Sequence, residues 1–586
     1  MNAKVFPVPR RGSLLPLIFL AGLLSVTASG GGGGSSGGEP PVAGNDPSVA
    51  ARTSTIPPGD AVCPTGGILV ETGIDENGNG VLDADEVDAS EKVCNGDQGP
   101  AGSDGLTALI DMNPEPAGAN CPQGGMRIDT GVDLNDNGVL ESGEIDQTGF
   151  ACNGADGAMG WQIPTVVDRL DSSVSMSGVD VAMDAGGNAI AVWVQNTGSH
   201  DAILSSRYVV GAGWSEPEAI DTVGNTESGS RPQVAMDAEG NALAVWVQYG
   251  STYADVWGNH YTAGVGWDGA VLLESSDTAV DFVNSPPKVA MTNGNGVVVW
   301  NQRNVTGRLE VYAKQYRQRA FVKWGVNAAL SDAAAGDTYY PQVAMDGTGN
   351  IMVVWAQDAG TSASIWSNRF TAGSTDWDGP LAIVQDLTVS LQYFDLAMDA
   401  VGNAQAVWAH GTGTYGVYDI RGSRYLAGSG WQAPETLDTG AGNAELPRVA
   451  MDPAGNAMVV WQQDDGTRYN VLARRYDATT ATWEEGQLVE TDNLADAGGP
   501  RVAMDASGNA MVVWRQAGFQ ATTIRSNNYR MGLGWGAAEL VETDTDRSAD
   551  GAEMAMDASG NVTVVWFQDD GSTTRYDLWA NRWGVP

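Results

Sequence analysis

The segments Val234-Ala-Met-Asp-Ala-Glu-Gly-Asn-Ala-Leu-Ala-Val-Trp-Val-Gln248 and Val502-Ala-Met-Asp-Ala-Ser-Gly-Asn-Ala-Met-Val-Val-Trp-Arg-Gln516 are two copies of one pattern. The pattern occurs eight times between residues 180 and 568, and each copy is marked by a tryptophan that lies 52 to 55 residues from the next. These tryptophans are Trp193, Trp246, Trp300, Trp355, Trp408, Trp461, Trp514 and Trp566. So regular a period is typical of stacked or radially arranged copies of one supersecondary unit.

One repeat divides into four predicted strands, at 234–237, 242–248, 256–261 and 270–273. A tight Asp-x-x-Gly-Asn turn joins the first two, in which the aspartate caps turn amides and the glycine tolerates a positive φ. Four-stranded antiparallel units repeated around an axis form a β-propeller. An open solenoid is the alternative architecture.

The ends of the repeat region favour a closed ring. The eighth unit stops at 581–586 without a fourth strand, whereas residues 160–168, before the first unit, match 213–221. The N-terminal strand is therefore expected to complete the last blade, which removes the exposed edges of an open stack. We predict an all-β fold, an eight-bladed propeller over residues 161–586.

The Asp-x-x-Gly-Asn hairpin is similar to that of NHL-type and other secreted bacterial propeller repeats. This resemblance implies the fold and carries no activity with it. The turn aspartate and asparagine are conceivable metal ligands, but the Asp-x-Asp-x-Asp-Gly pattern is absent, which favours turn capping.

Four cysteines enclose two segments of similar sequence, which we call the cysteine brackets. One runs from Cys63-Pro-Thr-Gly-Gly to Cys94 and the other from Cys121-Pro-Gln-Gly-Gly to Cys152. Four cysteines allow three pairings. A unit that duplicated intact closes its own bridge, so we predict Cys63–Cys94 and Cys121–Cys152 disulfides in an oxidising compartment. A two-cysteine zinc site is the alternative.

Each bracket contains a twelve-residue loop of the D-x-[DN]-x-[DN]-G-x5-E calcium type. Oxygen ligands are expected at loop positions 1, 3, 5, 7, 9 and 12. In the first loop these are Asp75, Asn77, Asn79, Val81 (through its carbonyl), Asp83 and Glu86, and in the second Asp133, Asn135, Asn137, Val139 (through its carbonyl), Glu141 and Glu144. An ion-free Asn-Gly turn is the alternative to calcium binding.

Short strands rather than helices precede both loops, at 67–73 and 125–131, so calcium is expected to stiffen a small module rather than to open a helix pair. The text resembles a small bacterial surface domain of unknown function that carries no known activity. We place these modules at 61–96 and 119–154, separated by a collagen-like spacer and linker at 97–118 and followed by a short glycine linker at 155–160.

Composition indicates export. The chain has 72 Asp and Glu against 30 Lys and Arg, a net charge of −42, which disfavours nucleic-acid binding. Basic residues, an apolar run and small residues over 1–28 predict a secretory signal peptide, and 29–60 reads as a Gly/Ser/Pro-rich linker. We expect a secreted or cell-surface protein with no lipobox cysteine and no transmembrane segment; the oligomeric state stays open.

No catalytic set is visible in the sequence. The histidines are His200, His260 and His410, and the last two occupy slots held by arginine and glutamine in other repeats. Neither a Ser–His–Asp set nor a phosphate loop is present, so we assign no catalytic residue.

The 2–3 and 4–1 loops share one face of a four-stranded meander, and in this chain they vary between units while the other turns are stereotyped. Variable loops on a rigid scaffold form recognition surfaces. Aromatic candidates for ligand contact are Tyr249, Tyr253, Tyr339, Tyr340, Tyr393, Phe394, Tyr415, Tyr469 and Phe519. We expect a non-enzymatic, calcium-binding recognition or adhesion protein for an extracellular glycan or protein; the alternatives are a polysaccharide hydrolase or lyase and a structural envelope component.

Overall fold

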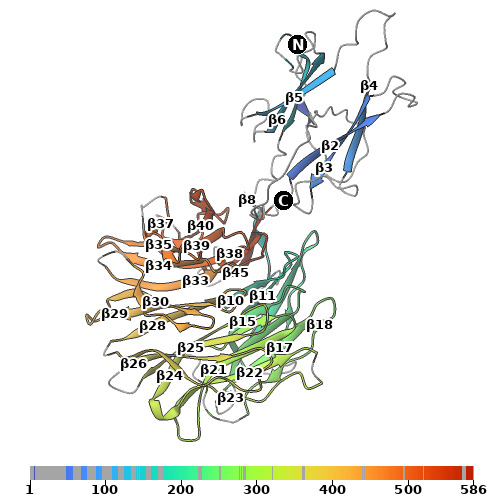
Figure 1. Cartoon of the computed structure of the whole chain (residues 1–586). Helices are drawn as coiled ribbons and strands as arrows, with labels where there is room; N and C mark the ends of the chain where they lie inside the picture. The colour runs from blue at the N-terminus through green and yellow to red at the C-terminus, as the bar shows by residue number, and fades with distance from the viewer. Residues whose placement is uncertain are drawn as a thin grey trace, which may run out of the picture. The chain divides into compact units, whose positions relative to one another are not determined.

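The computed structural model divides the chain into two compact units, Met1–Met159 with Val585–Pro586, and Gly160–Gly584 (Figure 1). In the first unit it describes the strands named below, Leu140 and Gly143. In the second it describes residues 160–584 except 169–175, 222–226, 250–252, 276–277, 279, 281–284, 320, 359–362, 388, 439, 441, 492–494, 519–520 and 570–575.

Two small sheets make up most of the described part of the first unit, antiparallel except for the parallel pair of β1 and β7. One sheet has the order β2-β3-β4, with β2 (Ser48–Ile56), β3 (Gly67–Asp75) and β4 (Val87–Cys94). The other has the order β1-β7-β6-β5, with β1 (Val5–Phe6), β5 (Ala108–Glu115), β6 (Gly125–Val132) and β7 (Ile145–Cys152). The strands expected before each loop are confirmed as β3 and β6. The linker assignments are corrected, because β2 and β5 lie in 29–60 and 97–118 and pair with the module strands.

The second unit is an eight-bladed β-propeller, as the repeat predicts (Figure 1). Blades 1 and 2 contain β10 (Met176–Met183), β11 (Ala189–Asn196), β12 (Asp201–Val209), β13 (Gly213–Trp214), β14 (Glu218–Ala219), β15 (Gly229–Met236), β16 (Ala242–Tyr249), β17 (Ala254–Thr262), β18 (Gly266–Trp267) and β19 (Val271–Leu272). Blades 3 and 4 contain β20 (Lys288–Thr292), β21 (Asn295–Arg303), β22 (Leu309–Arg317), β23 (Ala328–Ala329), the 3-10 turn η1 (Ala333–Ala335), β24 (Asp337–Met345), β25 (Ile351–Asp358), β26 (Ala363–Phe370) and β27 (Leu381–Leu387).

Blades 5 and 6 contain β28 (Leu391–Met398), β29 (Ala404–Gly411), β30 (Tyr418–Leu426), β31 (Gly430–Trp431), β32 (Glu435–Thr436), β33 (Ala444–Met451), β34 (Ala457–Asp464), β35 (Tyr469–Asp477), β36 (Thr482–Trp483) and β37 (Gln487–Leu488). Blades 7 and 8 contain β38 (Ala497–Met504), β39 (Ala510–Gln516), β40 (Thr523–Arg530), β41 (Gly534–Trp535), β42 (Glu539–Leu540), β43 (Ala549–Met556), β44 (Val562–Asp569), β45 (Tyr576–Gly584), β8 (Gly160–Trp161) and β9 (Thr165–Val166). None of these described elements is a helix long and apolar enough to cross a lipid bilayer.

The outer strand of six blades is split into two short pieces that both pair with the third strand. The sequence predicts one continuous strand at this place. In blades 1, 5 and 8 a proline interrupts it, at Pro217, Pro434 and Pro164, and proline cannot donate a ladder hydrogen bond. The split leaves the order of the four blade positions unchanged.

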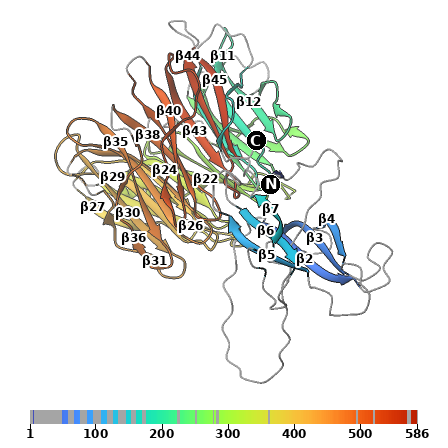
Figure 2. The ribbon, with the colours of Figure 1, turned by 90° about the horizontal axis from the view of Figure 1, so that it is seen from above.

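The N-terminal strand closes the ring, as predicted. Trp161 pairs with Trp583 and Val166 with Trp579, so β8 and β9 supply the outer strand of blade 8. Figure 2 shows the C-terminal strands β44 and β45 beside β11 and β12 of blade 1. The two ends of the repeat region are thereby joined through one sheet.

The motif tryptophans form the core of each blade. All eight are 0 or 1% exposed. In seven blades the indole Nε1 donates to the side-chain oxygen of the glutamine two residues later, at 2.9–3.3 Å. In five of these blades the glutamine Nε2 also donates to a carbonyl of the 4–1 loop. In these five blades the Trp-x-Gln pair therefore connects the core to the loop that enters the blade.

Contacts between blades use a second repeated pair. An arginine on the third strand of one blade lies over a tyrosine on the third strand of the next, and Arg582 over Tyr208, at 4.0 Å, makes this contact across the ring closure. In blade 2 the arginine slot holds His260, whose ring stacks on Tyr316 at 4.5 Å. His260 thus fills a structural position, as the sequence indicated.

Candidate functional site

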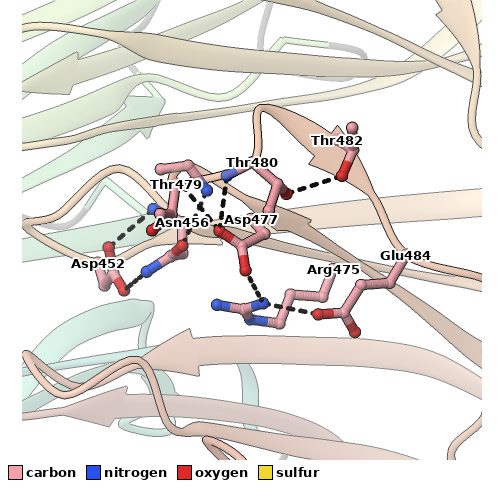
Figure 3. Close-up of polar contacts among 9 residues, drawn as sticks. Asp452, Asn456, Arg475, Asp477, Thr479, Thr480, Thr482 and Glu484 are labelled. Carbon is pink, nitrogen blue, oxygen red and sulfur yellow. Dashed lines mark hydrogen bonds and ion pairs between the residues drawn. The ribbon is translucent and has the colours of Figure 1, made fainter.

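The stereotyped face of the propeller is built from hydrogen-bonded turns. In blade 6 the Asp452 carboxylate accepts from the backbone N of Asn456 at 2.9 Å and from its side-chain amide at 2.5 Å (Figure 3). The Asn456 side-chain oxygen accepts from Ala478 N in the 3–4 turn, at 3.0 Å. The turn-capping interpretation is confirmed, because these polar groups are used to join the two hairpins of a blade.

Charged residues on this face are also paired within the blade. Arg475 Nη1 lies 2.7 Å from Glu484 and 3.4 Å from Asp477, whose carboxylate caps Thr479 N (Figure 3). The Arg475 side chain is 3% exposed, and its guanidinium lies over the Tyr529 ring of blade 7. These contacts orient the third strands against each other.

On the opposite face the innermost strands carry a bulge near the end where the 4–1 loop enters. Their pairing shifts register at this place in seven of the eight blades, blade 3 excepted. A residue with left-handed φ accompanies the shift, for example Tyr340 (φ 55), Tyr393 (φ 53) and Leu446 (φ 52). Such a conformation is uncommon outside glycine, so the surrounding blades must enforce it.

Four of the predicted ligand-contacting aromatics lie in these innermost strands rather than in loops. They are Tyr339 and Tyr340 in β24 and Tyr393 and Phe394 in β28. Phe394 is 4% exposed, stacks on Tyr340 at 6.1 Å and belongs to the core between blades 4 and 5. The assignment of Phe394 to a ligand surface is therefore wrong, because its ring is used for packing.

Tyr393, at the bulge of β28, interacts with a carboxylate and with other tyrosines of its own and the neighbouring blades. Burial raises the pKa of Tyr393, and the Glu445 charge raises it further, with Tyr418, Tyr340 and Tyr469 adding to the effect. These residues come from three consecutive blades. We call Tyr340, Tyr393, Tyr418, Tyr469 and Glu445 the tyrosine cluster.

Glu445 is held in place by two amide side chains. Asn443 Nδ2 donates to Glu445 Oε1 at 2.7 Å, and Gln462 Nε2 donates to Oε2 at 3.3 Å. The same Asn443 nitrogen lies 3.4 Å from the Tyr469 hydroxyl. The sequence pattern does not single out Glu445, Asn443 or Tyr418, because each stands at or beside a strand start whose neighbours are known only after the blades are assembled.

The remaining predicted aromatics lie apart from the tyrosine cluster or outside the described residues. Tyr415 is fully exposed in the 2–3 loop of blade 5, and Tyr249 and Tyr253, in blade 2, are 38% and 43% exposed. Phe519 lies outside the described residues. Exposure of Tyr415 and of the blade 2 tyrosines agrees with a recognition role for the 2–3 loops, which stays a prediction.

A second group of polar residues, which the repeat pattern does not reveal, lies near the propeller axis. The residue directly before the Val-Ala-Met-type segment of each innermost strand is polar or charged in every blade. We call these eight residues the axial ring: Asp180, Gln233, Lys288, Gln342, Asp395, Arg448, Arg501 and Glu553. Charges interact between blades that are not neighbours. In addition to burial, the Arg448 charge of blade 6 lowers the pKa of Lys288 in blade 3, and the Glu553 charge of blade 8 raises it. The eight residues occupy equivalent positions in the innermost strands of the blades, so they lie near the propeller axis.

Hydrogen bonds run along the axial ring from blade to blade. Arg501 binds Glu553 through two contacts, Nε to Oε2 at 2.6 Å and Nη2 to Oε1 at 2.5 Å. Lys288 Nζ donates to Gln233 Oε1 at 2.9 Å. The Asp180 carboxylate accepts from Val234 N, on the channel edge of the next blade, at 2.8 Å.

Asp180 has the most perturbed carboxylate of the axial ring. Burial raises its pKa to about 7, and the neighbouring Glu553 charge contributes, while hydrogen bonds from Val234 N and Val181 N act in the opposite direction. A carboxyl group with a pKa near neutrality is a candidate for proton transfer.

Most of the predicted calcium and disulfide residues lie outside the described residues. Asp75 ends β3, while Cys94 and Cys152 end β4 and β7. The other ligands and the first cysteine of each bracket lie in segments that the structure does not describe. Calcium binding and the disulfide pairing stay predictions.

The fold thus defines an eight-bladed β-propeller preceded by small β modules. Two segments, 50–94 and 108–152, match the model of a domain of unknown function (DUF7151). These segments begin near β2 and at β5, so the matched domain includes the strand before each cysteine bracket. No curated protein matches the chain.

Solved structures of several kinds are similar to this chain at low identity. A protein of unknown function from Dyadobacter fermentans is 12% identical over 51% of this chain and 94% of its own, with a TM-score of 0.32. An α-L-arabinanase from Penicillium chrysogenum, complexed with arabinobiose, is 10% identical over 73% and 99%, with a TM-score of 0.35. An ulvan lyase of polysaccharide lyase family PL25 is 11% identical over 57% and 89%, with a TM-score of 0.39. Scores this low carry no argument about function.

Proposed function

We propose that the protein is an exported recognition protein that binds a glycan at the variable-loop face of its propeller. The observation that carries this proposal is the tyrosine cluster, in which the half-buried Tyr340, Tyr393 and Tyr469 come from three consecutive blades, with Tyr418 buried in the adjoining core. The carboxylate of Glu445, which acts on Tyr393, is oriented by Asn443. Aromatic faces pack against the C–H faces of sugar rings, and a fixed carboxylate accepts hydrogen bonds from sugar hydroxyls. A few well-placed polar groups among aromatic side chains are typical of a ligand site.

The geometry of the cluster favours a preformed site. Glu445 is held by Asn443 and Gln462 before any ligand arrives, so little side-chain entropy is lost when it binds. Tyr415, fully exposed on the adjacent 2–3 loop of blade 5, offers a further aromatic face. The predicted signal peptide and calcium modules complete the proposal, in which the modules stiffen the segment that precedes the propeller.

A glycan array probed with the labelled full-length protein tests the binding proposal. Glu445→Gln and Tyr469→Ala are expected to weaken binding to the recognised glycans by at least about tenfold, as expected when about 1.4 kcal/mol of contact is removed. Tyr576→Ala is the matched control, since Tyr576 is 39% exposed at the start of β45 in blade 8, outside the cluster. Equal binding by all variants, or no glycan bound by the wild-type protein, would reject the proposal.

Glycan cleavage is the second candidate function, favoured by one observation. Asp180 and Glu553 are neighbouring carboxylates in the axial ring, and the Asp180 pKa of about 7 suits a general acid or base at neutral pH. Both are engaged in the structure, Glu553 by Arg501 and Asp180 by backbone amides. Release of new reducing or unsaturated ends by the wild type, and its loss in Asp180→Asn, would establish the enzyme instead.

A further inference from the structure

Basic residues are concentrated in the axial ring of an otherwise acidic chain. Three of the eight positions are Lys or Arg, although the chain has only 30 such residues among 586 and a net charge of −42. Ion pairing between blades accounts for one of the three, Arg501, which binds Glu553 through two contacts. Lys288 and Arg448 need another explanation.

These two cations interact with the charges of the acidic ring members Asp395 and Glu553 but are not hydrogen-bonded to a carboxylate in the described part of the propeller. Lys288 Nζ donates to the neutral Gln233 side chain at 2.9 Å, and Arg448 Nη1 to the carbonyl of Pro447 at 2.9 Å. Within the described part of the propeller neither forms an ion pair with a carboxylate. The two acids of the ring that Arg501 does not bind are engaged by backbone amides, Asp180 by Val234 N and Asp395 by Val449 N.

The positive charges also repel each other. Burial lowers the pKa of Lys288, and the Arg448 charge is the next largest cause, while the charges of Asp180, Glu553 and Asp395 act in the opposite direction. Burial likewise lowers the pKa of Arg448, with Arg501 adding to the effect and Asp395 and Glu553 opposing it. An anion placed between Lys288 and Arg448 relieves both the burial of their charges and the repulsion between them.

The axial ring is reachable from solvent. The Arg501 and Glu553 side chains are each 26% exposed, so the channel is not sealed at this level. Arg448 follows Glu445 by three residues in the same innermost strand, β33, so the ring lies close to the tyrosine cluster along the chain. A ligand held by the cluster would extend toward the ring.

We propose that the axial ring is a binding site for one oxyanion, with Lys288 and Arg448 as the two cationic ligands. The guanidinium group offers a planar fork of donors that matches a carboxylate or sulfate, and the ammonium adds a second charge. The oxyanion is either the carboxylate of an acidic sugar or a free small ion. The acidic-sugar source rests on the proposed glycan function, whereas the oxyanion site itself does not.

Calorimetry on the full-length protein with sodium glucuronate, glucose and sodium sulfate tests the site. Glucuronate and sulfate are expected to bind, glucose not to bind at the ring, and Lys288→Gln and Arg448→Gln to weaken anion binding at least tenfold. Lys323→Gln is the matched control, because Lys323 is 44% exposed and paired with Asp268. Tighter binding of glucuronate than of sulfate identifies the acidic sugar as the source, and the reverse order identifies a free ion.

A gain-of-charge variant keeps the test decisive if the ring variants fold poorly. Gln342→Glu introduces a carboxylate into the same ring, between the blades of Lys288 and Asp395, and is expected to displace the anion while the fold is kept. Unchanged anion affinity in this variant, or no anion binding by the wild type, would overturn the proposal. Glu445→Gln is expected to keep sulfate binding, so a failure of glycan recognition is distinguishable from a failure of the oxyanion site.

Discussion

Removal of the closing strand, residues 160–168, is expected to destabilise the propeller selectively at blade 8. This segment pairs with β45 through Trp161, Thr165 and Val166. Its backbone adds hydrogen bonds from Gln162 N to Arg582 O at 2.9 Å and from Val167 N to Leu578 O at 2.8 Å. Without the segment, β45 becomes an exposed edge.

The size of the effect follows from three contacts. Val167 is 0% exposed in the core between blades 8 and 1, and its burial contributes about 2 kcal/mol. The edge-to-face pair of Trp161 and Trp583, with centroids 5.7 Å apart, contributes about 1 kcal/mol. The hydrogen bond from Trp161 Nε1 to Ser526 Oγ, at 2.8 Å, contributes about 1 kcal/mol. The loss of about 4 kcal/mol is a large part of the 5–15 kcal/mol expected of a domain.

Differential scanning calorimetry measures this loss on the full chain with 160–168 deleted. For a unit spanning Gly160–Gly584 the unfolding entropy is on the order of 0.9 kcal/mol per kelvin, so Tm should fall by about 4–5 °C. Val167→Ala should cost about half as much, and Ile163→Ala, at an 85% exposed site in the same segment, should cost nothing measurable. An unchanged Tm in the deletion, or equal effects of the two alanine variants, would refute the closure argument.

Three further predictions concern stability and metal binding. Burial raises the pKa of Glu542 to about 7, so its stabilising contribution is complete below the unfolded pKa and is lost as pH rises through about 7. The free energy of unfolding should therefore fall less between pH 5 and 8 in Glu542→Gln than in the wild type, with a difference of at most about 3 kcal/mol. Urea denaturation at several pH values measures this, and the same pH profile in both proteins would contradict it. His410 replaces the glutamine of the Trp-x-Gln pair in blade 5 and leaves the buried Trp408 Nε1 without an acceptor in the described structure. His410→Gln should therefore stabilise the protein by about 1 kcal/mol. Thermal unfolding measures this, and a lower Tm in the variant would contradict it. Calorimetric titration of the full chain with millimolar calcium should show two sites, one lost in Glu86→Gln and the other in Glu144→Gln; no heat in the wild type would reject the calcium loops.

The sequence by itself determined the number of blades, the buried tryptophans and the closing strand, because these depend on local periodicity. A 52–55-residue period with one tryptophan per copy specifies equivalent sheets, and a fourth strand placed before the first copy specifies a closed ring. The sequence also showed that His260 stands at the repeat position held by arginine in other blades, because a repeat shows which residue belongs at each position.

Only the tertiary structure decided which residues meet on the axis and at the variable-loop face. The axial ring has no sequence signature, because one position holds aspartate, glutamine, lysine, arginine or glutamate in different blades and its members are about 50 residues apart. Radial packing of the innermost strands brings these charges within range of each other. The strand bulge likewise sends Phe394 into the core and leaves the neighbouring Tyr393 beside Glu445, since one inserted residue reverses the direction of the side chains that follow it.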